Sequence, residues 1–90
     1  MRIPLIPTGV WHLAQWQGQP HLATRFCFAS VPQALAWLLQ VGHLAEAQQH
    51  HPVLVWSHTT VECYIRTYDA NAVTEKDTAL ALAIQSLPRD

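Results

Sequence analysis

One alternating stretch decides the fold: residues 61–68 read VECYIRTY. Every second residue from Val61 to Thr67 points one way, and every second residue from Glu62 to Tyr68 points the other. A period of two is typical of a β-strand with one face on a core and the other in water or on a partner. We therefore expect a half-buried strand here, of the kind that antiparallel sheets use.

Further strands are predicted on both sides of this stretch. Residues 53–58 form a short apolar run that suits a strand, joined to residues 61–68 by a weak turn at Thr59-Thr60. Upstream, residues 10–17 and 21–29 lie on either side of the turn signal Gly18-Gln19-Pro20. These two segments are expected to form a hairpin.

Two helices complete the pattern. Ser30 can cap a first helix, Pro32 fits its first turn, and the helix should end near Gln49, ahead of Pro52. Its expected apolar face consists of Leu35, Leu38, Leu39, Gly42 and Ala45. A capping box at residues 74–77, TEKD, opens a second helix that ends at Pro88. Its expected buried stripe consists of Leu80, Ala83, Ile84 and Leu87.

The element order is strand, strand, helix, strand, strand, helix. It predicts an α+β fold in which a four-stranded antiparallel sheet carries both helices on one face and leaves the other face bare. A chain of 90 residues suits a single domain spanning residues 1–90. Within it, residues 1–9 are expected to form an irregular N-terminal arm, because Pro4 and Pro7 disfavour a regular helix.

Composition narrows the functional classes. Apolar residues make up 50% of the chain and charged residues 12%, with a net charge of −1, so disorder is not expected. The charges form no basic cluster, which argues against nucleic acid and anionic membrane as partners. No apolar run is long enough to span a bilayer or to serve as a signal segment. We expect a cytoplasmic protein with Cys27 and Cys63 as reduced thiols.

The densest polar cluster is residues 46–52, EAQQHHP. The pair His50 and His51 could give one proton and take another near neutral pH. Alternatively, the pair only occupies a helix end, where His is favoured by the helix dipole. A metal site built from His50, His51, His58 and Glu46 is a weaker alternative, because adjacent histidines diverge in direction and no zinc-binding spacing accompanies them. We expect no metal.

Three motifs resemble the pterin-4a-carbinolamine dehydratase family: Glu46-x-x-x-His50-His51-Pro52, Thr67-Tyr68-Asp69 and residues 73–77, VTEKD. The resemblance runs from about Leu22 to Leu87. It implies a small antiparallel-sheet protein that removes water from a 4a-hydroxytetrahydropterin without metal or cofactor. It also implies the following roles: His50, His51, Tyr68, Asp77 and Glu46 at the catalytic site, working or vestigial, and Pro52, Trp56 and Asp69 as contacts to pterin.

Two positions depart from the family motif, and one is His58, on which the aromatic residue of the family's third strand falls, although Trp56 is close. Tyr68 stands where the family has a third histidine, and a phenol with a free pKa near 10 is a poor base at neutral pH. Losing one positioned acid or base typically costs about 10²- to 10⁴-fold in rate. The chain is thus similar to degenerate family members that act as RuBisCO assembly factors associated with the α-carboxysome. That role is our leading prediction, and an active dehydratase is the alternative. A homodimeric binding module for another client is a third reading.

A partner surface is expected on the polar face of residues 61–68. Its candidates are Glu62, Tyr64, Arg66 and Tyr68. For Tyr64, packing within its own domain is an equal alternative, and Trp37 is expected to pack inside the domain. The partners implied are a second copy of the chain in a homodimer, RuBisCO subunits as the client, and pterin as ligand.

Overall fold

The structure, a computed structural model, describes residues 11–88 and has the predicted order of elements. Residues 1–9, predicted to be an irregular arm, lie outside the described part. The strands and helices are β1 (His12–Trp16), β2 (Gln19–Cys27), α1 (Val31–Gln48), β3 (Val53–Ser57), β4 (Thr60–Ile65) and α2 (Glu75–Gln85).

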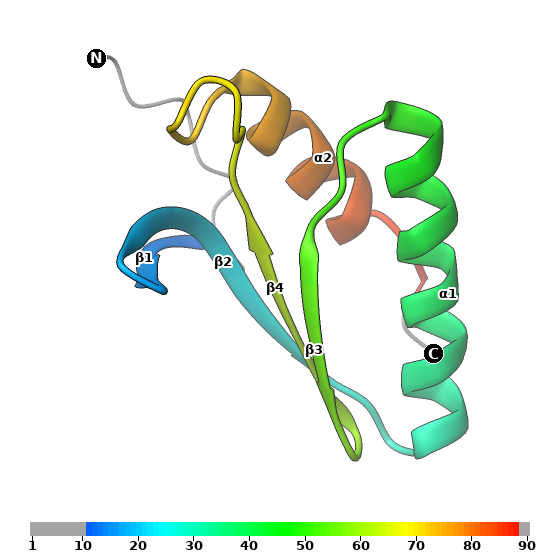
Figure 1. Ribbon diagram of the computed structural model, residues 1–90. Helices are drawn as coiled ribbons and strands as arrows, with labels where there is room; N and C mark the ends of the chain where they lie inside the picture. The colour runs from blue at the N-terminus through cyan, green and yellow to red at the C-terminus, as the bar shows by residue number, and fades with distance from the viewer. Residues whose placement is uncertain (1–10, 89–90) are drawn as a thin grey trace.

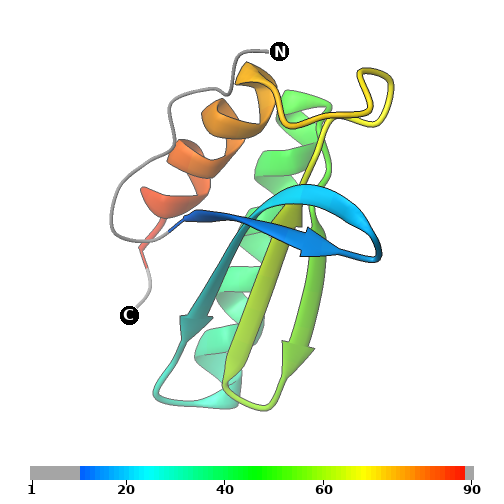
Figure 2. The same ribbon diagram turned by 90° about the vertical axis from the view of Figure 1, so that its left-hand side faces the viewer.

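The strands form one antiparallel sheet in the order β1-β2-β4-β3. Both helices lie on the same side of it (Figures 1 and 2). The predicted α+β fold is therefore confirmed. β2 and β4 form the centre of the sheet, and β1 and β3 form its edges.

Both hairpin turns use left-handed backbone. Gln17 and Gly18 have φ values of 51° and 77°, the pair of positive angles that a type I′ turn requires. This turn matches the twist of β1 and β2, and it lies one residue before the predicted signal. His58, with φ of 55°, begins the turn between β3 and β4, so β3 ends at Ser57 instead of His58.

The core fills the space between the sheet and the helices, and it corrects the predicted face of α1. The predicted Leu35 and Leu39 are 43% and 62% exposed. The buried residues of α1 are Ala34, Trp37, Val41 and Ala45. These also recur at helical spacing, and their alanines let the helix backbone approach its neighbours closely. Trp37 packs inside the domain as expected, with its ring 4.7 Å from that of Phe26.

β4 ends earlier than predicted. Its alternation holds for Val61, Cys63 and Ile65, which are fully buried, and burial raises the pKa of the Cys63 thiol to about 12. The prediction then continued the strand to Tyr68, with Arg66 on an exposed face. Instead the strand stops at Ile65 and Arg66 is only 7% exposed. The alternation in sequence runs on, but the chain leaves the sheet and folds into a loop.

The predicted start of α2 is confirmed. The hydroxyl of Thr74 accepts from the first turn, and the Asp77 side chain accepts from the Thr74 backbone, which completes a capping box. In α2, Leu80 and Ile84 are fully buried as expected, whereas Ala83 and Leu87 are half-buried and Ala81 is buried instead. Within residues 11–88, neither helix has the length and apolar character needed to cross a membrane.

The α1 face can be tested by truncating one buried and one exposed side chain. Val41→Ala should lower the free energy of unfolding by about 2 kcal/mol, because it removes buried methyl groups from a packed core. Leu39→Ala, the matched control, should cost less than about 0.5 kcal/mol, because Leu39 is exposed. Urea unfolding at several protein concentrations would separate these effects from self-association. Equal losses would contradict the observed face.

Candidate active site

Three segments that are distant in sequence meet at one end of the fold. They are the last turn of α1, the loop that follows β4 and the first turn of α2, all at the top of Figure 1. This end carries the histidine pair and the Asp77 carboxylate, so most of the residues that the sequence singled out lie together.

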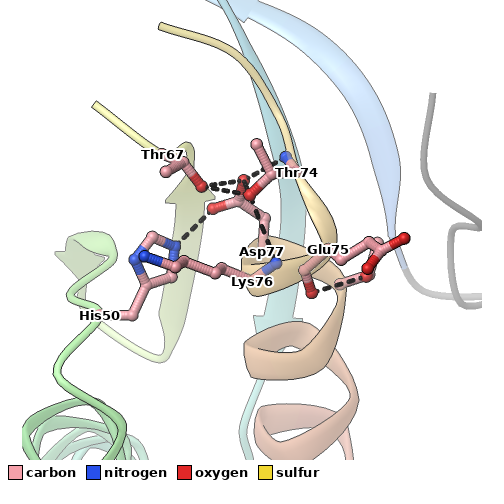
Figure 3. Close-up of polar contacts among 7 residues, drawn as sticks. His50, Thr67, Thr74, Glu75, Lys76 and Asp77 are labelled. Atoms are coloured by element: carbon pink, nitrogen blue, oxygen red, sulfur yellow. Dashed lines mark hydrogen bonds and ion pairs between the residues drawn. The ribbon is translucent and has the colours of Figure 1, made fainter. Parts of the chain in front are cut away.

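The carboxylate of Asp77 is the centre of this cluster (Figure 3). It is fully buried. Its Oδ2 accepts from the backbone N–H of Thr74 at 2.7 Å and from the hydroxyl of Thr67 at 2.8 Å. Its Oδ1 lies 2.6 Å from Nε2 of His50. A buried carboxylate needs such partners, since an unpaired buried charge is strongly unfavourable.

His50 is positioned by the end of α1 as well as by Asp77. The helix ends at Gln49 in left-handed conformation, with φ of 52°, and the N–H of His50 donates to the carbonyl of Ala45 at 3.1 Å. The side chain is 14% exposed. Asp77 engages Nε2 of the imidazole, which leaves Nδ1 as its remaining polar atom.

His51 has its own carboxylate partner. Its Nε2 lies 2.9 Å from Oε1 of Glu46, one turn back on α1. The hydrogen bond from His51 is the main reason that the pKa of Glu46 lies below its ordinary value of 4.5, with a smaller contribution from Gln49. Glu46 is therefore ionised throughout the neutral range. Both side chains of this pair are well exposed, so the pair contributes little to folding.

An open cleft of about 460 Å³ lies beside these histidines. Its walls are His50, His51, Thr67, Tyr68, Asp69 and Lys76. The size is within the roughly 300–1,000 Å³ typical of small-molecule sites. A second hollow of about 400 Å³ adjoins it, because the two share Thr67, Asp69 and Lys76. Imidazole, phenol, carboxylate and ammonium groups thus surround one space that could hold a flat heterocycle.

Two predicted pterin contacts do not line this cleft. Pro52 is half-buried just before β3, and Trp56 lies four residues further, about 13 Å along an extended strand. The indole N–H of Trp56 donates to the carbonyl of His58 at the far turn. Within this chain, only Asp69 of the three predicted pterin contacts lies on the wall of the cleft.

The predicted partner surface is partly occupied by the chain itself. Tyr64 stacks on Trp16 with ring centroids 4.8 Å apart, and its hydroxyl donates to Glu62, which raises the pKa of the phenol. Arg66 is buried, which corrects its predicted exposure. Tyr68 is 62% exposed, but it lines the cleft.

Sequence reasoning missed two contributors to the site, Thr67 and Lys76. Thr67 was expected to face the core, yet its hydroxyl bonds to Asp77 and to Thr74. Lys76 supplies the only cation among the cleft residues apart from the histidines. Both residues stand in the family motifs, at residues 67–69 and 73–77, so membership of those motifs could have identified them. Among residues 11–88, no cluster of three or more His, Cys, Asp or Glu side chains could hold a metal ion.

The difference between the two carboxylates gives a prediction about stability. Asp77→Asn should destabilise the fold by about 3–5 kcal/mol, because it weakens the hydrogen bonds that converge on a buried carboxylate, including the cap of α2. Glu46→Gln should leave stability nearly unchanged, because Glu46 is exposed. Chemical unfolding of the two variants measures both values. A loss below 1 kcal/mol for Asp77→Asn would contradict the central role of this carboxylate.

Comparison with known proteins places this chain in a family. The family model described as pterin 4 alpha carbinolamine dehydratase matches residues 6–87. A protein of Chloroflexus aggregans whose name assigns it to this activity is 38% identical over 81 residues, which cover 84% of this chain and 86% of the relative. A similarly named protein of Gloeobacter violaceus is 32% identical over 80 residues, with 89% and 87% covered.

Two solved structures share the fold. One is a transcriptional coactivator/pterin dehydratase from Brucella melitensis, with a TM-score of 0.74, 24% identity, and 82% of this chain and 79% of the other covered. The other is a pterin dehydratase-like protein identified as a RuBisCO assembly factor in the alpha-carboxysome, with a TM-score of 0.73, 24% identity, and 88% and 89% covered. At this identity the likeness shows the fold alone. The family model and the relatives carry the assignment, and this chain belongs to the pterin-4a-carbinolamine dehydratase family.

Proposed function

We propose that the protein catalyses loss of water from a 4a-hydroxytetrahydropterin. The observation that carries this proposal is the pair of imidazoles at one cleft, each held by its own carboxylate. The contact between His50 and Asp77 also stabilises the fold, so by itself it is weak evidence for catalysis. The exposed contact between His51 and Glu46 is different, because it contributes little to stability. A chain that had only kept the fold would not need it.

The reaction requires two proton transfers. The C4a–O bond breaks as the hydroxyl gains a proton and leaves as water, while a ring nitrogen loses a proton and a C=N bond forms. In the proposed arrangement His50 takes the proton from the ring nitrogen, and Asp77 stabilises the imidazolium that results. His51, oriented by Glu46, supplies the proton to the hydroxyl.

Tyr68 has a narrower role than a histidine would have. A phenol offers an O–H group that donates a hydrogen bond, and it lacks the basic ring nitrogen of an imidazole. On the wall of the cleft it would orient the leaving hydroxyl. The proposal therefore expects a working enzyme that is slower than one with an imidazole at this position.

A second candidate function is assembly of RuBisCO. It is favoured by the departure at Tyr68 and by the solved assembly factor with the same fold. It does not require the cleft, since a client would bind to the outer surface. The exposed apolar residues of the fold are available for that role; they include Leu35, Leu39, Val55 and Trp56.

A dehydration assay tests the enzymatic proposal. His50→Ala and His51→Ala should each lower kcat by about 10²- to 10⁴-fold, because each removes a positioned acid or base. His43→Ala is the matched control, because His43 is exposed on α1 and does not line the cleft. Tyr68→His should raise kcat. If wild-type protein does not exceed the uncatalysed rate, the enzymatic proposal fails.

Co-expression with RuBisCO subunits tests the second candidate. The expected result is a higher yield of soluble holoenzyme, retained in His51→Ala because the cleft is not used and the exposed His51 contributes little to folding. An unchanged yield with the wild type would exclude assembly as a function for the subunits tested. Loss of the effect in His51→Ala would instead tie assembly to the cleft.

A further inference from the structure

The loop that carries Tyr68 is closed at its base. Thr67 donates its N–H to the carbonyl of Ala72 at 2.9 Å, and Ala72 donates to Thr67 at 3.3 Å. Inside this bridge, the N–H of Asn71 donates to the carbonyl of Tyr68 at 3.1 Å, and Asn71 has left-handed backbone with φ of 53°. The backbone of the loop is thus fixed, but these bonds do not hold the Tyr68 side chain.

Arg66 is the side chain that touches both ends of this loop. Its Nη2 donates a hydrogen bond to Oδ1 of Asn71. Its Cζ lies 5.4 Å from the centroid of the Tyr68 ring, within the range of a cation–π contact. The buried guanidinium of Arg66 therefore connects Asn71, near the end of the loop, to Tyr68, which lines the cleft.

Stability alone does not account for an arginine at this position. The residue is 93% buried, being 7% exposed, and its Nε has no hydrogen-bond partner within residues 11–88. A buried donor without a partner is unfavourable for folding. An unbranched apolar side chain of similar length would fill the same space without that penalty. The guanidinium is thus better explained by what it holds in place.

We propose that Arg66 is a positioning residue that fixes the phenol of Tyr68 against the cleft. The loop bonds set the backbone, and the guanidinium sets the ring. The catalytic consequence rests on the proposed dehydration, because Tyr68 matters to rate only if the cleft turns over pterin. The structural part, order in the Tyr68 side chain, stands independently of activity.

NMR relaxation tests the structural part without substrate. Arg66→Met keeps the length and apolar stem of the side chain but removes both contacts. The order of the Tyr68 ring on the ps–ns timescale should fall, while the backbone order parameters of the loop and of β4 stay near about 0.85. If Tyr68 stays as ordered in Arg66→Met as in the wild type, the proposal is overturned, whatever the protein does to pterin.

Variants of Asn71 provide the matched pair. Asn71→Gly keeps the left-handed backbone but removes the acceptor, so it should also disorder the Tyr68 side chain. Asn71→Asp keeps an acceptor and tolerates the same backbone, so it should preserve the order. If the Tyr68 side chain becomes as disordered in Asn71→Asp as in Asn71→Gly, the hydrogen bond from Arg66 to residue 71 is not what positions the Tyr68 ring.

A double-mutant cycle tests the catalytic part. Arg66→Met should lower kcat by up to about 10²-fold with little change in KM, which is what a small misplacement of a catalytic group can cost. In a Tyr68→Phe background the same change should have no further effect, because Arg66 acts through the phenol. An equal loss in both backgrounds would overturn the proposal. If the wild type is inactive, the proposed function fails while the NMR result still decides the role of Arg66.

Discussion

The buried carboxylate of Asp77 is the constraint on which the rest of the structure depends. It caps the first turn of α2 through Thr74, holds the end of the sheet through Thr67 and orients His50 at the end of α1. A charge with no exposed surface is tolerated only because all these donors converge on it. Folding and the alignment of the candidate base are therefore one event. This also explains how a loop-rich end of a small domain can present a defined site.

Local patterns predicted the elements well, because caps and turns are local. The capping box at residues 74–77 and the order of elements are both present in the structure. The predicted face of α1 was right for Ala45 and Leu38 but wrong for Leu35 and Leu39, because leucines were given more weight than alanines. A face with Ala34 and Ala45 allows close packing, and it leaves Leu35 and Leu39 outside. The end of β4 was wrong because alternation cannot report where a chain leaves its sheet. That point is set by the loop that closes on Ala72.

The sequence predicted which residues belong to the candidate site, but it did not predict which of them contact one another. The family resemblance supplied His50, His51, Glu46 and Asp77, and the structure brings them to one end of the fold. The periodicity of a sequence cannot show that His50 and Asp77 are in contact, because they are 27 positions apart. The contact from Arg66 to the loop was hidden for a related reason. An arginine in an alternating strand reads as solvent-exposed, and only the departure of the chain from the sheet turns it inward.

The distribution of charge separates the candidate site from the remaining surface. Only 12% of the residues are charged, and among those that the structure describes most gather at the cleft end. The members of this group are Glu46, Arg66, Asp69, Glu75, Lys76 and Asp77. The remaining two, Arg25 and Glu62, lie opposite each other across β2 and β4. The polar cleft end and the weakly charged remaining surface thus occupy different parts of the fold. A substitution at the cleft therefore leaves the outer surface as it is, so the two proposed functions, dehydration and assembly, place separate demands on this chain.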